Sequence, residues 1–493
     1  MPPPITRNTV FCGDNLAIMR EYIPDASVDL VYLDPPFNSN RNYNVLFKDE
    51  SGRDSDAQIT AFEDTWHWNE VAERTYQALV TAGQERVARV ISALRNILGT
   101  NQMMAYLVMM APRLVELDRV LQPTGSIYLH CDPTASHYLK LLLDAIFGPA
   151  QFRSEIIWSY RRWPSKTPNY QHMHDVLLYY AKGEHPTFNV LHEPASASFL
   201  RRFKGKGNRL DPDATTKRAT DDETPGMPLR DVWELSILAG SSAERLGYPT
   251  QKPLALLERV IQTSSNPGDV VLDPFAGCGT TVAAAQQLGR RWIGIDITHL
   301  SIAILKYRLD GLFPAIQYRV LGEPQDMGAA RQLAADDRYQ FQFWALSLLR
   351  AKPLGGQEGG KSGKKGRDRG VDGVINFLDD SSGKAQRAVV QVKSGHVQPG
   401  DIRDLKGTVS REEAAIGVFL TLEAPSKEML TEAISSGYYH SPGWGQDYPR
   451  IQILTIAQLL DGAEIQMPPQ SSTFKQLAKA TPATAAQPTL DLD

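Results

Sequence analysis

The sequence has few cysteines, no long apolar run and almost no excess of charge of either sign. The three cysteines, Cys12, Cys131 and Cys278, form no CxxC pair, which argues against a zinc site and against a disulfide framework. No apolar run approaches the about 20 residues of a membrane span, and the N-terminus lacks a basic segment followed by an apolar core. We therefore expect a cytoplasmic protein without a membrane segment.

The net charge of −4 over 493 residues does not by itself identify a protein that binds polyanions. If the partner is nucleic acid, the positive charge must be concentrated locally. The candidate basic residues are Arg161, Arg162, Arg201, Arg202 and Lys204. At about 100–200 residues per domain, the length predicts two or three domains.

Strand-like and helix-like patterns alternate at short intervals over most of residues 1–320. The main expected strands are 28–33, 126–130, 269–272 and 291–295, and the main expected helices are 101–121, 254–263, 280–288 and 300–309. This alternation predicts an α/β domain with a doubly wound, mostly parallel sheet. The periodicity weakens over about 159–246, where Arg, Lys, Pro, Gly and aromatic residues become more frequent, and this change marks an inserted segment.

The pattern changes again beyond residue 314. A second, smaller α/β domain is expected over 325–465, with strands over 373–378 and 388–393. The tail over 466–493 is rich in Ala, Thr, Pro and Gln, a composition that is typical of disorder.

The strand over 28–33 ends at an unusual stretch, Asp34-Pro35-Pro36-Phe37. Proline fixes φ, has no N–H and holds the preceding residue extended, so the chain makes a stiff elbow that cannot continue as a helix. The elbow presents a carboxylate, backbone carbonyls and an aromatic ring, a set that suits a neutral amine on a planar heterocycle. Taken alone, an ordinary strand followed by a Pro-Pro loop explains the stretch equally well.

A second stretch, residues 270–281, reads as strand, Gly-rich turn and helix start. Such a turn brings backbone N–H groups close to a ligand at the carboxyl edge of a sheet. Val282 stands where a dinucleotide motif has its third glycine, and Asp296 ends the next strand about 20 residues on, where a carboxylate can accept both ribose hydroxyls. A nucleoside without phosphates, such as S-adenosylmethionine, fits this pattern, with a generic βα connection as the alternative.

The order of Asp34-Pro35-Pro36-Phe37, then YPTQKP over 248–253, then DPFAGCG over 273–279 resembles the amino-group DNA methyltransferases of the β arrangement, over about residues 8–320. The resemblance implies a Rossmann-like methyltransferase domain over 1–320, S-adenosylmethionine as cofactor and double-stranded DNA as partner. The implied cofactor pocket comprises Asp273, Phe275, Gly277, Gly279, Thr280 and Asp296, with Thr250 and Lys252 at its side. It also implies a target base that is flipped out against the elbow, and a target-recognition region over about 159–246. A homodimer stays open.

The chemistry of the elbow agrees with this resemblance. If Asp34 and the Pro35 carbonyl each accept one N–H, the amine nitrogen is drawn toward tetrahedral geometry and its lone pair can face the sulfonium methyl group. Cytosine C5 methylation would need a cysteine nucleophile, typically after proline, and the chain has no Pro-Cys pair. A leading Asp resembles the N6-adenine group more often, so adenine N6 is the predicted target. N4-cytosine methylation, a nuclease that uses this part for recognition, and an inactive DNA-binding module remain alternatives.

In the second domain, Asp372 precedes one expected strand, and Gln391 and Lys393 end the next. A period of two places Gln391 and Lys393 on the same face, so both can converge on Asp372. A carboxylate, a second oxygen ligand and a lysine are the groups needed to hold Mg²⁺ and to assist hydrolysis of a phosphodiester, with Asp372 as the metal ligand.

This arrangement resembles the Mrr-type branch of the PD-(D/E)xK nucleases over about residues 335–425, in which Gln replaces the second acid. One departure is that Gln340 and Gln342 stand on the preceding helix where an acid is expected. An active Mg²⁺-dependent nuclease, a degenerate DNA-binding domain and two strands with incidental polar ends therefore all stay open.

Overall fold

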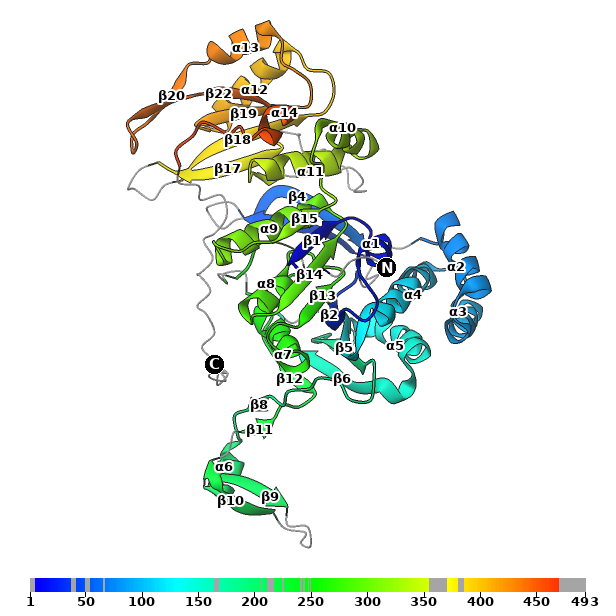
Figure 1. The fold of residues 1–493 in the computed structure, drawn as a ribbon. Helices are drawn as coiled ribbons and strands as arrows, with labels where there is room; N and C mark the ends of the chain where they lie inside the picture. The colour runs from blue at the N-terminus through cyan, green and yellow to red at the C-terminus, as the bar shows by residue number, and fades with distance from the viewer. Residues whose placement is uncertain are drawn as a thin grey trace.

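The computed structural model describes residues 5–36, 41–48, 54–64, 67–163, 168–204, 206–210, 217–223, 226–239, 242, 244–246, 248, 250–353, 370–379 and 385–469. Figure 1 shows two α/β parts, an N-terminal part built on a nine-stranded sheet and a C-terminal part built on a five-stranded sheet. Phe37 lies outside the described residues, and so does the tail after residue 469. None of the helices in the described part combines the length and the apolar character needed to span a bilayer.

The N-terminal sheet is mostly parallel. Its strands lie in the order β12 (Val232–Glu234), β6 (Phe152–Ser159), β7 (His174–Ala181), β5 (Leu121–Cys131), β2 (Val28–Leu33), β13 (Val270–Asp273), β14 (Arg291–Asp296), β1 (Thr9–Cys12) and β15 (Arg319–Leu321). Only β7 runs antiparallel to its neighbours β5 and β6. The predicted α/β class with a doubly wound, mostly parallel sheet is confirmed.

Helices cover both faces of this sheet because alternate strand residues point to opposite sides. In β2, Val31 and Leu33 pack in one buried cluster, while Leu30 and Tyr32 pack in the other. The first face carries α1 (Asn15–Tyr22), α2 (Glu70–Ala82), α3 (Glu85–Leu98), α4 (Gln102–Val120) and α5 (Pro133–Phe147). The second face carries α7 (Leu254–Ser264), α8 (Thr280–Gln287) and α9 (His299–Leu312).

Strand β7 corrects the predicted extent of the inserted segment. Residues 174–181 were expected within the insertion, but they form a buried strand of the central sheet, and β12 pairs with β6 at its edge. The signal was missed because this short apolar run is flanked by charged and polar residues. The part that leaves the sheet comprises β8 (His192–Glu193), α6 (Ala197–Phe203), β9 (Lys206–Leu210), β10 (Lys217–Glu223) and β11 (Met227–Pro228), which project from the body in Figure 1.

Two further elements lie between the elbow and α2, namely β3 (Arg41–Lys48) and β4 (Asp54–Asp64), which form an antiparallel pair. A short 3-10 helix, η1 (Pro149–Gln151), links α5 to β6. Asp132 caps the N-terminus of α5, where its side chain accepts from the Thr134 and Ala135 N–H groups, and Gly148 follows the last residue of the helix.

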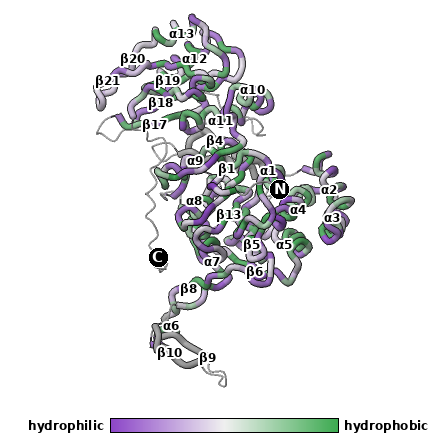
Figure 2. The backbone as a smooth tube through the Cα atoms, in the orientation of Figure 1, coloured by the Kyte–Doolittle hydropathy of each residue, from purple (hydrophilic) through white to green (hydrophobic). Residues whose placement is uncertain are grey.

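The C-terminal sheet has the order β16 (Lys352–Pro353), β17 (Gly373–Leu378), β18 (Ala385–Lys393), β19 (Ile416–Thr421) and β22 (Ile451–Thr455). One face packs against α10 (Met327–Asp336), α11 (Arg338–Leu348) and α14 (Ile456–Leu460). The other face packs against α12 (Pro399–Arg411) and α13 (Lys427–Ile434), and β20 (Tyr438–Ser441) pairs with β21 (Gln446–Pro449). Figure 2 shows hydrophobic and hydrophilic residues mixed along these helices, as expected for helices that bury one face.

The two parts touch through α9 and α11. The His299 N–H, in the first turn of α9, donates to Gln340 Oε1 at 2.9 Å. Phe343 packs against a small buried cluster of Tyr248, Cys278, Leu300 and Ile304. Gln340 therefore serves the contact between the two parts, at the position where a nuclease of the predicted type is expected to carry an acid.

Candidate active site

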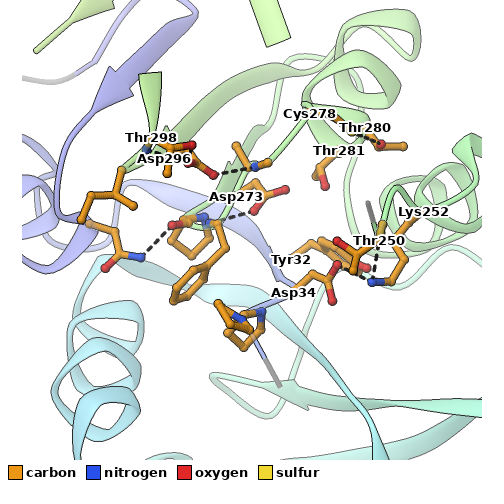
Figure 3. Close-up of a pocket in the computed structure, with 18 of the residues that line it drawn as sticks. Tyr32, Asp34, Thr250, Lys252, Asp273, Cys278, Thr280, Thr281, Asp296 and Thr298 are labelled. Atoms are coloured by element: carbon orange, nitrogen blue, oxygen red, sulfur yellow. Dashed lines mark hydrogen bonds and ion pairs between the residues drawn. The ribbon is translucent and has the colours of Figure 1, made fainter. Parts of the chain in front are cut away.

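A cavity of about 280 Å³ opens at the carboxyl ends of the parallel strands β1, β2, β13 and β14. Open α/β sheets bind ligands at this edge because the loops there diverge. Figure 3 shows Asp34, Asp273 and Asp296 on its walls, with Thr250 and Lys252 facing Asp34. Strands β2 and β13 are adjacent, with Leu30 paired to Val271, so two stretches far apart in the chain meet in one site.

Asp34 follows the last residue of β2 and is held at the cavity wall by the two prolines after it. Its Oδ2 atom forms an ion pair with Lys252 Nζ at 2.5 Å. Its Oδ1 atom is buried and has no hydrogen-bond partner among the described residues. A buried carboxylate oxygen normally has a donor, so this atom is arranged to receive one from a ligand.

Thr250 and Lys252 belong to the turn that precedes α7. Thr250 has φ +60°, a conformation that is strained for a β-branched residue. The Thr250 carbonyl accepts from Lys252 Nζ at 3.4 Å, so this turn directs the ammonium group toward Asp34. Both residues line the cavity, and Lys252 contacts the carboxylate of the elbow.

The Gly-rich turn between β13 and α8 needs its glycines for two physical reasons. Gly277 has φ +49° and Gly279 has φ +74°, which side chains rarely adopt. A Cβ on Gly279 would lie 2.6 Å from Leu305 Cγ, and one on Gly277 would lie 3.3 Å from the Tyr248 ring. Gly277 lines the cavity, whereas Gly279 is not among the lining residues and instead packs closely against Leu305 of the core; α8 begins at Thr280.

Two carboxylates border this turn. The Gly277 N–H donates to Asp296 Oδ2 at 2.9 Å, and the Phe275 N–H donates to Asp273 Oδ1 at 3.0 Å. Burial is the main cause that raises the pKa of Asp273 to about 7, and the negative charges of Asp34 and Asp296 raise it further. The hydrogen bonds from Thr281 and the Phe275 N–H lower it, but by less. Burial also raises the pKa of Asp296. A cationic ligand at this wall would favour the ionised form of both carboxylates.

Sequence reasoning missed the stretch Gly13-Asp14-Asn15, which lines the same cavity from the end of β1. Asn15 Nδ2 donates to the Pro274 carbonyl at 2.7 Å, and Arg113 Nε donates to Asn15 Oδ1 at 2.6 Å. Arg113 also pairs with Asp14 at 2.5 Å. Only the parallel pairing of β1 with β14 brings this turn to the cofactor motif, so no local sequence pattern could have identified it.

The candidate DNA-binding residues fall into two places. Arg161 and Arg162 follow β6, which is parallel to β2 through two antiparallel pairings with β7, so they lie at the same sheet edge as Asp34. Both are exposed, and the Arg162 guanidinium stacks 4.7 Å above the Tyr160 ring. Arg201, Arg202 and Lys204 are exposed residues of the projecting segment around α6, where Lys204 caps the helix with φ +51°.

The candidate nuclease-like residues do lie on adjacent strands. The Asp372 backbone N–H donates to the Val390 carbonyl at 2.9 Å, and Asp372 Oδ2 accepts from the Val392 N–H at 2.6 Å. Lys393 Nζ lies 3.6 Å from Asp401 Oδ1 on α12. Gln391 Oε1 is buried without a hydrogen-bond partner among the described residues.

The donor set for a metal at this second site is small. Within the described ranges, no group of three or more His, Cys, Asp or Glu side chains is arranged to hold a metal ion. Asp372 and Gln391 are the oxygen donors on which the predicted Mg²⁺ site rests, and Mg²⁺ commonly takes one or two carboxylates plus substrate phosphates.

Comparison with known proteins agrees with this geometry. A family model described as DNA methylase matches residues 28–306. The type II methyltransferase M.HpaI of Haemophilus parainfluenzae is 34% identical over 324 residues, which cover 64% of this chain and 80% of that protein. The DNA adenine methyltransferase YhdJ of Escherichia coli K12 is 28% identical over 307 residues, which cover 61% of this chain and 82% of that protein. The chain therefore belongs to the DNA methylase family of the N6-adenine and N4-cytosine type.

Two further similarities are more limited. A solved structure of a DNA modification methylase from Thermus thermophilus, complexed with S-adenosyl-L-methionine, covers 64% of this chain and 99% of that chain at 18% identity, with a TM-score of 0.36. A second family model, described as NACHT-associated inactive restriction endonuclease 1, matches residues 358–461. The resemblance of the C-terminal part to restriction endonucleases agrees with this match.

Proposed function

We propose that the chain transfers a methyl group from S-adenosylmethionine to the exocyclic amine of a base that is flipped out of double-stranded DNA. The observation that carries this proposal is the buried Asp34 Oδ1 atom, which has no hydrogen-bond partner among the described residues and borders the cavity of the Gly-rich turn. An amine N–H is the donor that this atom lacks. Membership of the DNA methylase family supports the same reaction.

The residues of this chain position the amine and leave its lone pair available. Asp34 Oδ1 and the Pro35 carbonyl each accept one N–H, so the third direction of the nitrogen faces the methyl donor. The cofactor supplies the methyl group on a sulfonium, which leaves as a neutral thioether. Lys252 holds the other Asp34 oxygen at 2.5 Å and so fixes the orientation of the carboxylate. In this proposal Pro36 and Phe37 complete the base pocket.

The cofactor would lie along the Gly-rich turn. In this proposal Asp296, at the end of β14, accepts the ribose hydroxyls, and the absence of a side chain at Gly277 leaves room for the nucleoside. Phe275, Thr280 and Thr250 line the same cavity, and Asp273 is the buried carboxylate nearest to Asp34 along the sheet. Asn15 and Arg113 extend this wall on the other side.

We propose adenine N6 as the target. The leading Asp of the elbow and the similarity to a protein named DNA adenine methyltransferase support this choice over cytosine N4. Expression in a host that lacks DNA methylation, followed by nucleoside analysis and modified-base sequencing, tests it. The expected product is N6-methyladenine at one short sequence motif. Detection of N4-methylcytosine instead would show that cytosine N4 is the target. If the DNA carries no modified base, the proposed function is wrong. The similarity to type II methyltransferases supports a role in restriction and modification or in related DNA marking.

Contacts with the DNA backbone are assigned to exposed basic residues. Arg161 and Arg162 lie at the catalytic edge, while Arg201, Arg202 and Lys204 extend the positive surface onto the projecting segment. Replacement of a phosphate-contacting residue by Ala should weaken DNA binding for all sequences alike and reduce its dependence on salt.

For the C-terminal part, we propose DNA binding without cleavage. The matching family model is described as an inactive restriction endonuclease, and α11 carries glutamines where an acid is expected. Incubation of the full chain with unmethylated genomic DNA and Mg²⁺ tests this proposal. Cleavage that is lost in D372A or K393A would establish a nuclease instead.

A further inference from the structure

A buried histidine lies directly behind Asp34 and is not used by the mechanism above. His130, near the end of β5, is 0% exposed. Its Nδ1 atom lies 2.7 Å from the Tyr32 hydroxyl and 4.0 Å from Asp34 Oδ1. Its Nε2 atom lies 3.3 Å from Asp175 Oδ2. The imidazole is therefore placed between two carboxylates from two different strands.

The topology of the sheet explains how these groups meet. Strand β7 runs antiparallel to β5, so its first residues, including Asp175, lie at the carboxyl edge where His130 and Asp34 also lie. Tyr32 and Asp34 are two residues apart and point to the same face of the sheet. The reversed strand thus brings a carboxylate to the edge at which the reaction is proposed to occur.

Asp175 is kept ionised by its surroundings. Burial would raise its pKa, but the hydrogen bond from His130, the positive charge that His130 carries once protonated, the charge of Lys252 and the hydrogen bond from Tyr160 outweigh burial and lower the pKa to about 2. The Tyr160 hydroxyl donates to the other carboxylate oxygen at 3.0 Å. Asp175 is therefore a fixed negative charge on the far side of the imidazole from Asp34.

The charged groups around His130 are mostly acidic, and such surroundings stabilise a proton on the imidazole. Asp34 and Asp175 face it as carboxylates, and Lys252 is the ammonium group that pairs with Asp34. Asp273 on β13 and Asp132 after β5 add further negative potential, while Tyr32 and Tyr160 contribute hydroxyl groups. The neighbouring Trp158 ring packs edge-on at 5.5 Å and excludes water from that side. A proton on the imidazole would therefore lie among carboxylates that outnumber the one ammonium group.

We propose that His130, held by Asp175, accepts the proton that the substrate amine releases, with Asp34 as the intermediate carrier. The inference rests on the proposed function. As the nitrogen bonds to the methyl carbon, the carbon–sulfur bond breaks and its electron pair stays on sulfur. The amine nitrogen then gives one proton to Asp34 Oδ1, and Asp34 passes it to His130 Nδ1.

The groups beside the imidazole accommodate this transfer. The Tyr32 hydroxyl, which donates to Nδ1 of the neutral ring, turns to accept from the imidazolium, and Asp175 stabilises the charge through Nε2. Asp34 returns to its ionised form for the next turnover. Since His130 acts through Asp34 and does not contact the base, it is a positioning residue whose role is to keep that carboxylate able to accept a proton.

The test measures single-turnover transfer from tritiated S-adenosylmethionine, kept saturating at every pH, to unmethylated genomic DNA, with enzyme in excess over DNA, from pH 5.5 to 8.5. The wild-type rate should fall toward acid pH, because a base that already holds a proton cannot accept the one that the amine releases. H130N should be slower by at least about tenfold at pH 7.5 and should lose this acid limb. D175N should also slow transfer and should shift this limb, because an amide does not hold the ring at Nε2 as the carboxylate does. H137N, which changes an exposed histidine of α5, should match the wild type.

The outcomes separate this inference from the proposed function. A wild type that transfers no methyl group overturns the function itself. An active wild type without an acid limb overturns the role of His130 alone, as does an H130N variant whose rate or acid limb is unchanged. Thermal unfolding and S-adenosylmethionine affinity of each variant show whether it is folded. If H130N does not fold, an acid limb that stays in place in D175N overturns the inference.

Discussion

Asp34 directly follows β2 and Asp372 directly precedes β17, so each carboxylate stands beside a strand of an α/β sheet, but the two have different hydrogen-bond partners. Asp34 Oδ1 has no hydrogen-bond partner among the described residues and faces a cavity. Asp372 Oδ2 accepts the Val392 N–H of the adjacent strand at 2.6 Å. Asp34 therefore keeps one acceptor available for a ligand at the cavity, whereas Asp372 already uses one of its oxygens to bind the neighbouring strand.

The lysines of the two sites differ in their exposure and in the distance to their acidic partners. Lys252 is 9% exposed and lies 2.5 Å from Asp34, whereas Lys393 is 32% exposed and lies 3.6 Å from Asp401. Water screens the second pair more strongly, so it fixes its partner less well. The N-terminal site is therefore the one that is organised for chemistry.

The largest expected effect concerns the carboxylate of the elbow. D34A should reduce methyl transfer by at least about 10²–10³-fold, because it removes an acceptor that acts on the reacting nitrogen. Cofactor affinity, measured by calorimetry, should change by no more than about twofold, since the cavity wall formed by Asp273 and Asp296 is intact. D372A is the matched control and should methylate at the wild-type rate. Equal losses in both variants would remove the distinction between the two sites.

The second prediction uses the raised pKa of Asp273. Its pKa of about 7 in the folded chain exceeds the value of 3.8 of the free side chain, so the folded state binds the proton more tightly. The stability that Asp273 contributes is fully present below about pH 4 and is lost as the pH rises through 7. Without cofactor, D273N should therefore gain in free energy of unfolding relative to the wild type between these pH values, by on the order of 2–4 kcal/mol.

Urea unfolding of both proteins at pH 4.5, 6 and 8 measures this difference. The wild type should also bind S-adenosylmethionine less tightly below pH 7, where a protonated Asp273 must first ionise. If the difference in stability between the two proteins does not vary with pH, Asp273 is ionised at every pH tested. The raised pKa, and with it the preference of this wall for a cationic ligand, would then be wrong.

The third prediction concerns the ion pair at the elbow. K252M should lower the single-turnover rate by about tenfold, because the Asp34 carboxylate loses the partner that fixes its orientation. K393M, its counterpart in the C-terminal part, should leave methyl transfer unchanged. If K252M instead accelerates the reaction, Lys252 competes with the base for Asp34 rather than supporting it.

Much of the fold could be predicted from the sequence. The strand before Asp34, the turn at Gly277 and Gly279 and the helices that follow are set by local patterns of apolar residues, proline and glycine, and the structure contains them. Asp34 and the Gly-rich turn were both expected at the ends of strands, where ligand sites gather, but the adjacency of β2 and β13 comes only from the structure.

Other features depend on long-range pairing, which no local pattern encodes. Asp175 lies in a reversed strand within a segment of weak periodicity, so its approach to His130 follows only from the register of β7 against β5. Asn15 reaches Pro274 because β1 pairs with β14 across the chain. The nuclease-like motif was recognised correctly as a pattern, but the hydrogen bond of Asp372 to the Val392 N–H could not be read from it.

The smallest expected effect tests whether the two parts are independent. Gln340 Oε1 accepts the His299 N–H at 2.9 Å, next to the wall formed by Asp296 and Thr298. Q340A should lower the free energy of unfolding by about 1 kcal/mol, the net worth of one hydrogen bond, and should weaken cofactor binding by no more than a few-fold. Q342A, two residues along α11 and so on another side of the helix, is the control. Since both substitutions lie in the C-terminal part, a large loss of cofactor affinity in Q340A alone would mean that this part supports the cofactor wall, and the nuclease-like fold would then act on the methyltransferase site through α9.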